Sequence, residues 1–235
     1  NIVSKTDWNG AVTTYTYNDR NLEISRTEAV GTDLERSIKT TWHSDYAVVT
    51  SITTESNKQV FEYSDVGLLL SHTTYDLSAE QNWFQSLTDS YPSRTVNYEY
   101  NKIGQLVQVD GARTDVADTT TYEYDEVGNQ TSVTNALGHS SKVTKFDAAG
   151  RPLHLIAANG LVTELAYNER GWLSSKTIVT GEGDNQTRAM TEYHYTHSGD
   201  YLGKGQVERI VSPNGGVTQY TYDKAYRVKS IENQL

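Results

Sequence analysis

The segment from Thr120 to Val133, TTYEYDEVGNQTSV, gives the clearest indication of the fold in this chain of 235 residues. Tyr122 and Tyr124 are two positions apart, so both project from the same face of an extended strand. Asp125 can hydrogen-bond its own backbone and open a turn, and Gly128 can adopt the positive φ that follows a type I turn. The segment therefore predicts a β-hairpin whose first strand ends in an aromatic residue.

Copies of this motif recur along almost the whole chain. Close relatives are VNYEYNKIGQLVQV from Val96, KVTKFDAAGRPLHL from Lys142 and VTELAYNERGWLSS from Val162. We call the last aromatic residue before each turn the anchor. Successive anchors are 21 to 37 residues apart, roughly the length of two strands of about 8 residues and two short turns. The nine anchors are Tyr17, Trp42, Tyr63, Tyr100, Tyr124, Phe146, Tyr167, Tyr195 and Tyr222. We therefore predict an all-β fold, a single array of about nine antiparallel hairpins over residues 1–235.

The turns after the anchors share a spacing. A short polar residue usually follows the anchor, and a glycine usually follows three residues later, which is typical of a type I turn followed by a glycine bulge. Tyr46 and Tyr226 stand at the glycine position in two copies, so we expect those turns to differ in form. Between copies, Asn159-Gly160 and Asn214-Gly215 indicate two-residue hairpin turns. The turn positions assigned in this way are Asp125, Asp147, Asp223, Gly67, Gly104, Gly128, Gly150, Gly171 and Gly199.

The longest interval between anchors, 37 residues, is too long for one hairpin. In it, Ser78 and Gln81 form a capping box, and Trp83 and Leu87 fall on the same helical face. We expect a short helix near residues 78–88. A long irregular loop with buried aromatic residues is the alternative.

The composition excludes several classes of protein. Hydrophobic residues make up 36% of the chain, which is below the usual share and favours a thin sheet with two partly wet faces. The formal net charge is −10 and there is no run of Lys and Arg, so binding to nucleic acid or to an anionic membrane is disfavoured. The absence of cysteine excludes disulfides and thiolate chemistry. No apolar run reaches the roughly 18 residues of a membrane span.

The sequence contains no motif of a known enzyme. It has no Gly-x-Ser-x-Gly elbow, no phosphate-binding glycine loop and no His-Glu-x-x-His. His194 and His197 would face opposite ways on a strand, so they are not expected to share a metal. The acidic turns near residues 110–118 and 182–185 match no calcium-loop spacing, and solvated turns explain them better. We therefore expect no catalytic residue, no cofactor and no metal.

The quoted repeats resemble the YD/Rhs repeat family. Its members include bacterial Rhs polymorphic toxins, the B and C subunits of Tc insecticidal toxins, wall-associated YD-repeat proteins and the teneurins. The resemblance extends from about Thr13 to Ile231. It implies a continuous antiparallel sheet that curves or spirals into a hollow shell or barrel, which in the bacterial members encloses a C-terminal toxin. The family's self-cleaving segment, with its DPxGxxDGxNxYxY signature, is absent from this sequence.

The resemblance also implies a role and partners. The expected function is that of a structural shell segment that encapsulates or presents a C-terminal effector and performs no chemistry itself. The expected setting is secretion or export from a bacterium in toxin delivery, although the chain shows no signal-peptide pattern. The expected partners are the remainder of a longer parent chain and its toxin cargo.

The edges of the predicted sheet suggest self-association. The strands near Thr13–Thr16 and Arg227–Ile231 carry modest charge and no proline, so their unpaired backbone groups are weakly protected against other strands. We expect this fragment not to close into a container alone. It should instead associate through its edges with another copy or with the parent chain.

A carbohydrate-binding or adhesive module is the alternative function. Rows of Tyr and Trp on a sheet can stack against sugars. The same rows also arise because cross-strand aromatic pairs stabilise a sheet, so the sequence leaves both interpretations open.

Overall fold

The computed structural model describes residues 1–79, 91–181, 183–196 and 205–234. These residues form nineteen β-strands and one turn of 3-10 helix at Gly183–Asn185. The strands are β1 (Ser4–Thr6), β2 (Val12–Tyr17), β3 (Glu23–Glu28), β4 (Arg36–Trp42), β5 (Val49–Thr53), β6 (Asn57–Tyr63), β7 (Leu69–Asp76), β8 (Ser93–Tyr100), β9 (Leu106–Asp110), β10 (Thr120–Tyr124), β11 (Gln130–Thr134), β12 (Ser140–Phe146), β13 (Pro152–Ile156), β14 (Val162–Tyr167), β15 (Leu173–Thr180), β16 (Thr187–Tyr195), β17 (Val207–Val211), β18 (Val217–Tyr222) and β19 (Val228–Gln234).

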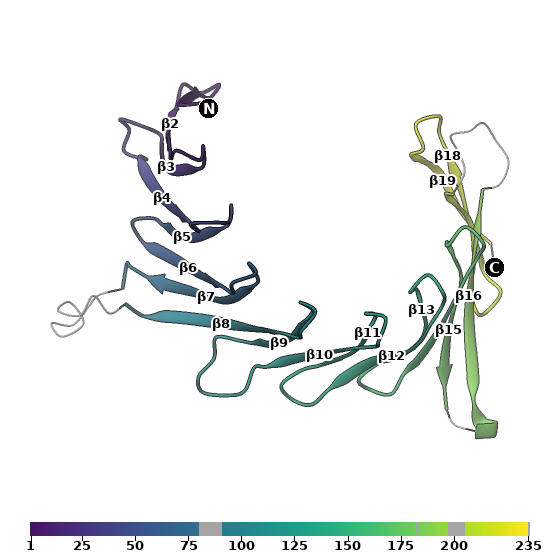
Figure 1. The fold of residues 1–235 in the computed structure, drawn as a ribbon. Helices are drawn as coiled ribbons and strands as arrows, with labels where there is room; N and C mark the ends of the chain where they lie inside the picture. Colours follow the sequence, from purple (N-terminus) through teal and green to yellow (C-terminus); the bar gives the residue numbers. More distant parts are fainter. Residues whose placement is uncertain (80–90, 182, 197–204, 235) are drawn as a thin grey trace. The chain divides into compact units, whose positions relative to one another are not determined.

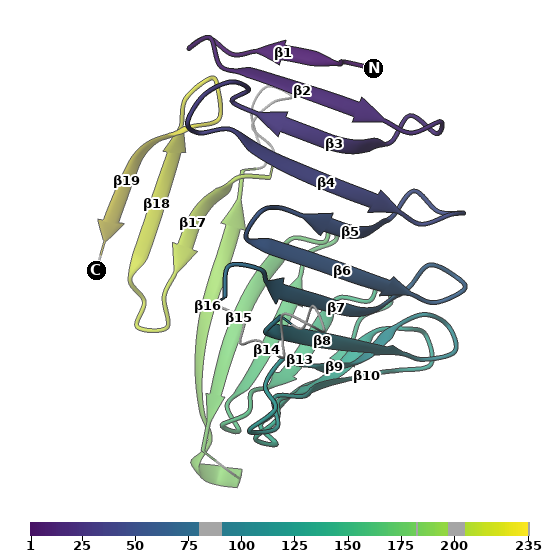
Figure 2. The ribbon, with the colours of Figure 1, turned by 90° about the vertical axis from the view of Figure 1, so that its left-hand side faces the viewer.

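The strands form one antiparallel sheet in which partners are neighbours in sequence. Figure 1 shows this succession, and Figure 2 shows β2 to β8 side by side with alternating directions. The predicted all-β array of consecutive hairpins is therefore confirmed. Most of the predicted helix near residues 78–88 lies outside the described residues.

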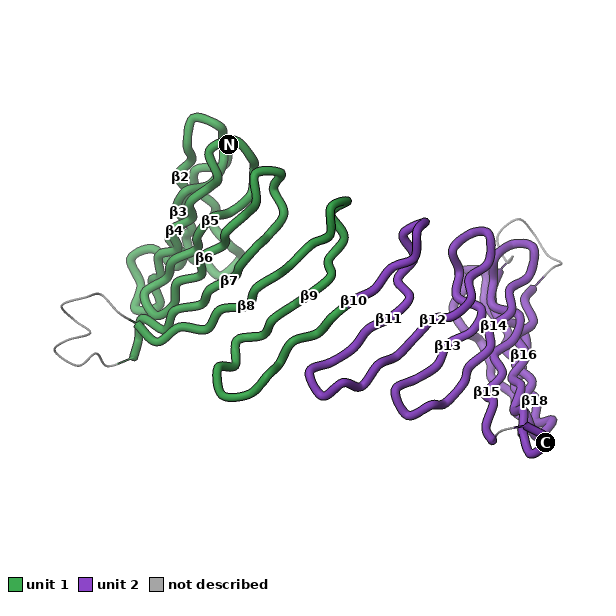
Figure 3. Tube along the Cα trace, turned by 60° about the horizontal axis from the view of Figure 1, so that its bottom comes forward, with its two compact units in different colours: residues 1–121 green, residues 122–235 purple. Residues whose placement is uncertain are grey.

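Two compact units divide the chain, residues 1–121 and residues 122–235 (Figure 3). In the first unit the strands pair in order from β1 to β9, and the first two residues of β10 pair with β9. In the second unit the strands pair in order from β11 to β19. Both units thus have the same local architecture.

Strand alternation gives the sheet two different faces. We call the face that carries the anchors the anchor face. In the first unit, Phe61, His72 and Val96 lie in register on it, and the rings of Phe61 and His72 stack with centroids 4.5 Å apart. In the second unit, Tyr193 and Ile210 lie in register on it. Aromatic and aliphatic side chains therefore concentrate on one side.

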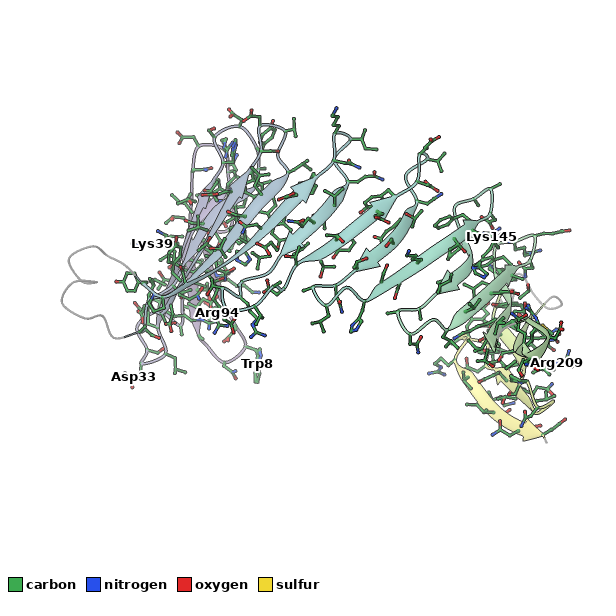
Figure 4. The ribbon with its side chains drawn as sticks, turned by 90° about the horizontal axis from the view of Figure 1, so that it is seen from below. Trp8, Asp33, Lys39, Arg94, Lys145 and Arg209 are labelled. Atoms are coloured by element: carbon green, nitrogen blue, oxygen red, sulfur yellow. The ribbon has the colours of Figure 1, made fainter. Side chains whose placement is uncertain are left out.

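The opposite face is mainly polar, and we call it the polar face. Hydroxyl groups pair across its strands, as in the 2.9 Å bond between the Oγ1 atoms of Thr73 and Thr95. Charged side chains also lie on it. Figure 4 labels two of them, Lys39 on β4, in register with Thr53, and Arg209 on β17, in register with Gln219. Solvent is the natural environment of this face.

A conventional hydrophobic core is absent from the described part of the chain. Val179, at 4% exposure, is the only buried hydrophobic side chain among the described residues, and the other buried side chains are Ser71, Ser132 and Thr177. The sheet is a single layer, as the low hydrophobic content predicted. Contacts between successive hairpins must therefore supply most of the stability.

Candidate functional site

The hairpin tips share one five-residue loop. At Asp125 the backbone N–H bonds to the carbonyl oxygen of Asn129 at 2.9 Å, and the Gly128 N–H donates to the Asp125 carbonyl at 3.1 Å. The Asp125 carboxylate accepts the N–H groups of Val127 and Asn129 at 3.1 and 2.8 Å. One side chain thus satisfies two loop donors, and Gly128 has a φ of 95°. This is a type I turn with a glycine bulge.

The same backbone pattern recurs at six other tips. It opens with Asn18, Ser64, Asn101, Asp147, Asn168 and Asp223. Positive φ occurs at Gly67, Gly104, Gly150 and Gly171. Gly199 lies outside the described residues.

Two tips carry a tyrosine where most of the others carry glycine; the tip that opens with Asn18 carries Asn21, which has a φ of 61°. The prediction that the Tyr226 turn differs in form is wrong. Tyr226 has a φ of 60°, and its backbone N–H donates to the Asp223 carbonyl at 3.0 Å, as the glycine N–H groups do in the other loops. Asp223 takes part in four hydrogen bonds of the loop, two through its backbone and two through its carboxylate. Together they stabilise the loop by more than the roughly 1–2 kcal/mol that a side chain at positive φ costs. The Tyr46 turn does differ, because His43 bonds to the Val48 carbonyl and the loop is one residue longer.

Several connections at the other end of the hairpins use the same loop. Two-residue turns were expected at Asn159-Gly160 and Asn214-Gly215, and this expectation is wrong. The Ala157 N–H bonds to the Leu161 carbonyl, and the Gly160 N–H bonds to the Ala157 carbonyl at 2.8 Å. A two-residue type I′ turn needs positive φ at both central residues. Only Gly160 has it, so the chain forms the longer loop.

Five of the anchors hydrogen-bond to the chain that precedes their own hairpin. We call the second strand of a hairpin its return strand. The Tyr63 hydroxyl donates to the carbonyl oxygen of Val49, the first residue of the preceding return strand, at 2.9 Å. The Tyr222 hydroxyl donates in the same way to Val207 at 2.8 Å. We call this hydrogen bond the anchor bond. The other examples are Trp42 Nε1 to Glu23, Tyr195 to Leu173 and Tyr17 to Ile2, at 2.8, 2.8 and 2.7 Å.

The anchors are not all equivalent. Phe146 has no hydroxyl and cannot form an anchor bond. Tyr167 lies beneath the Arg151 guanidinium, 4.7 Å from the ring centroid, which is a cation–π contact. Burial raises the pKa of Tyr63, Tyr195 and Tyr222 above the usual tyrosine value. These phenols therefore stay protonated and remain donors at neutral pH.

A second contact between hairpins involves the fifth loop residue. Trp172 packs on Tyr195, the next anchor, with ring centroids 5.1 Å apart. It also lies over the next loop, where a Cβ added at Gly205 would be 2.8 Å from Trp172 Cζ2. Arg151 occupies the same position relative to Gly171. Glycine in these loops thus provides space as well as positive φ.

The row of anchor bonds and fifth-residue contacts forms what we call the anchor seam. The sequence analysis proposed the anchors as structural residues, but it did not propose the acceptor carbonyls or the fifth loop residues. These residues, among them Leu68, Asn129, Arg151 and Trp172, share no chemical type. Their fixed distance from the anchor was the only signal that could have identified them.

Three carboxyl groups in the loops have pKa values below the usual value for aspartate. The amide of Asn129 donates to Asp125 and lowers the pKa of that carboxyl, with help from the loop N–H groups. The backbone N–H groups of Arg151 and Arg227, the fifth residues of their loops, donate to the carboxylates of Asp147 and Asp223. These hydrogen bonds lower the pKa of both carboxyl groups. These carboxylates stabilise the loops in their charged form.

The described residues contain no cluster of side chains that could hold a metal ion. Across residues 1–79, 91–181, 183–196 and 205–234, no three His, Asp or Glu side chains gather as a metal site would require. His194 Nε2 lies 3.2 Å from Arg209 Nη2 and 3.4 Å from Glu192 Oε2, while His197 is outside the described residues. Asp118 accepts the Arg113 N–H within its own loop. No helix in the described part of the chain is long and apolar enough to cross a membrane.

Comparison with protein families gives one match. A family model described as the teneurin YD-shell matches residues 75–234. A comparison with curated proteins finds no match.

Solved structures share the fold. The crystal structure of TcdB2–TccC3 without its hypervariable C-terminal region matches with a TM-score of 0.74 and 18% identity, covering 97% of this chain and 12% of that chain. The crystal structure of TcdB2–TccC3–TEV gives 0.72 and 16%, with the same coverage. The Tc holotoxin pore of Photorhabdus luminescens gives 0.59 and 15%, covering 99% of this chain and 14% of that chain. The chain therefore spans a small part of the length of these proteins.

Proposed function

The chain belongs to the teneurin YD-shell family, and we propose from this membership that it is a segment of a shell that encloses or presents a C-terminal effector. The anchor seam is the observation that carries the proposal. Each anchor bond joins a hairpin only to the preceding one, so the sheet can be extended by adding hairpins and needs no core. A thin, extensible layer is suited to a wall.

The setting and partners of this segment follow from the same proposal. One matched structure is described as lacking a hypervariable C-terminal region, and another is described as a Tc holotoxin pore. By analogy, the segment acts in an exported toxin-delivery protein, and its partners are the rest of its parent chain and the cargo. Its own residues are structural and not catalytic.

Protease access in the full-length parent protein tests enclosure. Replacing Tyr195 and Tyr222 with Phe removes two anchor bonds while keeping the rings. We expect the C-terminal effector to be cleaved several-fold faster in this double variant than in the wild type. Replacing Tyr193 and Tyr220 with Phe is the matched control, because these residues lie two positions earlier on the same strands. An effector cleaved equally fast in all three proteins would contradict the proposal.

A glycan-binding surface is the second candidate. Trp8, which is 93% exposed in the first outer loop, is the observation in its favour. The anchor rings are less suitable, because their polar groups bond to backbone carbonyls. Screening a glycan array with the wild type, Trp8→Ala and Trp172→Ala decides between the candidates. Specific binding lost in either variant would favour the module.

A further inference from the structure

One hairpin tip in the first unit is opened by a histidine. In the loop between β4 and β5, the Nδ1 atom of His43 accepts the backbone N–H groups of Asp45 and Tyr46 at 3.1 and 3.3 Å. The imidazole thus has the role that the carboxylate of Asp125 or the amide oxygen of Asn101 has at other tips. Unlike those oxygens, a ring nitrogen accepts hydrogen bonds only while it carries no proton.

The His43 tip is the middle one of three tips that are joined to one another. The tips between β2 and β3, β4 and β5, and β6 and β7 lie along the same side of the sheet (Figure 2). From the first tip, the Arg20 guanidinium donates to the carbonyl oxygens of His43 and, at 2.6 Å, of Ser44. From the middle tip, the Tyr46 hydroxyl donates to the Asp65 carbonyl of the third tip at 2.8 Å. The loop that His43 organises therefore connects three hairpins.

The contact with the third tip depends on how His43 holds Tyr46. The two rings pack against each other with centroids 5.0 Å apart. The Tyr46 ring also lies against Gly67 of the third tip, where an added Cβ would be 3.8 Å from Tyr46 Cδ2. The backbone of Tyr46 is fixed by its bond to His43 Nδ1. Loss of that bond therefore frees the side chain that bridges the second and third hairpins.

The charges around the imidazole decide how it responds to a proton. The Arg20 guanidinium, bonded to the His43 carbonyl, repels an imidazolium. The acidic side chains in this region are the exposed Asp19, Asp45 and Asp65, one on each tip, and the half-buried Glu23 at the start of β3, which pairs with Arg26 at 3.8 Å. Solvent screens the attraction of the three exposed carboxylates. A proton on Nδ1 also points at two N–H groups, so both loop hydrogen bonds are lost with it.

We propose that His43 makes this tip an acid-sensitive clasp between hairpins of the first unit. At neutral pH the ring carries its proton on Nε2, Nδ1 accepts both N–H groups, and the three tips are joined. In mild acid, protonation of Nδ1 opens the loop, Tyr46 leaves Asp65 and Gly67, and the second tip separates from the third while the strands stay paired. Histidine ordinarily takes up its proton near about pH 6.5, so the change falls between roughly pH 7.5 and pH 5. The clasp goes beyond the shell function and does not rest on it, because all its contacts lie within the first unit.

NMR spectroscopy of the whole chain labelled with nitrogen-15 tests the clasp. At about pH 7.5, the Nδ1 signal of His43, identified by its loss in His43→Asn, should have the chemical shift of a ring nitrogen without a proton. The protection of the Asp45 and Tyr46 amides against exchange with solvent, corrected for the intrinsic effect of pH, should fall about 10- to 30-fold on going to pH 5, because two neutral hydrogen bonds are lost.

Two protein variants assign the effect to His43. His43→Asn supplies an acceptor oxygen that does not titrate, as Asn18 and Asn101 do at their tips, and should keep the protection within about 2-fold over the same pH range. His139→Asn removes an exposed histidine from an outer loop of the second unit and should respond to acid as the wild type does. Circular dichroism verifies that both variants are folded. A proton on Nδ1 of wild-type His43 at neutral pH, unchanged protection of the wild type in acid, or the same loss of protection in His43→Asn would overturn the proposal.

Discussion

At the scale of single residues, each hairpin tip depends on two separable requirements. One is a side-chain oxygen that accepts two loop N–H groups, supplied by Asp, by Asn or, for one N–H, by Ser64. The other is a backbone at positive φ, supplied mostly by glycine. Ala157 opens a loop of the same form without any side-chain acceptor, and there Asn159 bonds to the Leu161 N–H at 3.1 Å. The backbone conformation is therefore the common element.

The loop carboxylates make stability dependent on acid. The lowered pKa values of Asp125, Asp147 and Asp223 mean that the folded state binds fewer protons than the unfolded state. Their contribution is complete above the usual Asp pKa of about 3.9 and is lost as the pH falls through the lowered folded values. The triple Asp→Asn variant should lose less stability between pH 6 and pH 3 than the wild type, because Asn maintains the loop without titrating. Urea denaturation at both pH values measures this, with Asp33→Asn as the control. An equal loss in both proteins would contradict it.

Glycine in these loops has two separate effects that substitution can distinguish. Gly160→Ala introduces only the cost of positive φ, roughly 1–2 kcal/mol, because no atom lies within 4 Å of the new Cβ. Gly205→Ala adds a clash with Trp172, whose ring is fixed against Tyr195. We expect it to cost roughly 1–3 kcal/mol more. The denaturation midpoints of the two variants give the comparison, and equal midpoints would show that Trp172 moves aside.

Sequence reasoning located most loop positions but not every conformation. The spacing from anchor to glycine was informative because few residues tolerate positive φ. It failed at Tyr226, where the hydrogen bonds to Asp223 stabilise an unfavourable backbone. It also failed at Asn159-Gly160, because a dipeptide cannot reveal which strand residues will pair beside it.

At the scale of elements, the hairpin is completed by its predecessor. An anchor strand contributes its ring to its own hairpin and its polar group to the return strand before it. The strand alternation that places anchors on one face was readable from the sequence. The acceptor was not, because it is a backbone carbonyl that any residue could supply. This explains why the acceptor positions contain residues as different as Glu23 and Leu173.

Removing an anchor hydroxyl measures how much the anchor bond contributes to the free energy of unfolding. Tyr63→Phe and Tyr222→Phe should each destabilise the chain by about 0.5–1.5 kcal/mol, because a neutral hydrogen bond is lost and the ring is kept. Tyr220→Phe on the same strand as Tyr222 is the control and should be nearly neutral, since no anchor bond involves it. Chemical denaturation provides the three values. Similar losses in all three variants would show that the anchor position has no special role.

At the scale of the whole molecule, stability is the sum of local contributions. The pairings run from each strand to its neighbours in sequence, and the described residues contain no layer packed on either face. The low hydrophobic content predicted the thin sheet. The sequence did not predict the division into two compact units, because the same repeat pattern continues across residues 121 and 122.

Hydrogen exchange should reveal this additive stability. In a chain of nearest-neighbour contacts, the terminal elements open without disturbing the interior. We expect amides of β1 and β19 to exchange fastest, and amides of strands well inside each unit, such as β6 and β15, to exchange slowest. Mass spectrometry of peptic fragments after exchange gives the profile. Uniform protection along the chain would indicate a single cooperative structure.

The pairing of each strand with its predecessor also has a consequence for synthesis. A hairpin leaving the ribosome finds its acceptor carbonyls and its neighbouring strand in chain that has already emerged. No element must wait for a distant partner to be translated, so folding can keep pace with elongation. The exposed growing edge is then covered by the next hairpin soon after it forms.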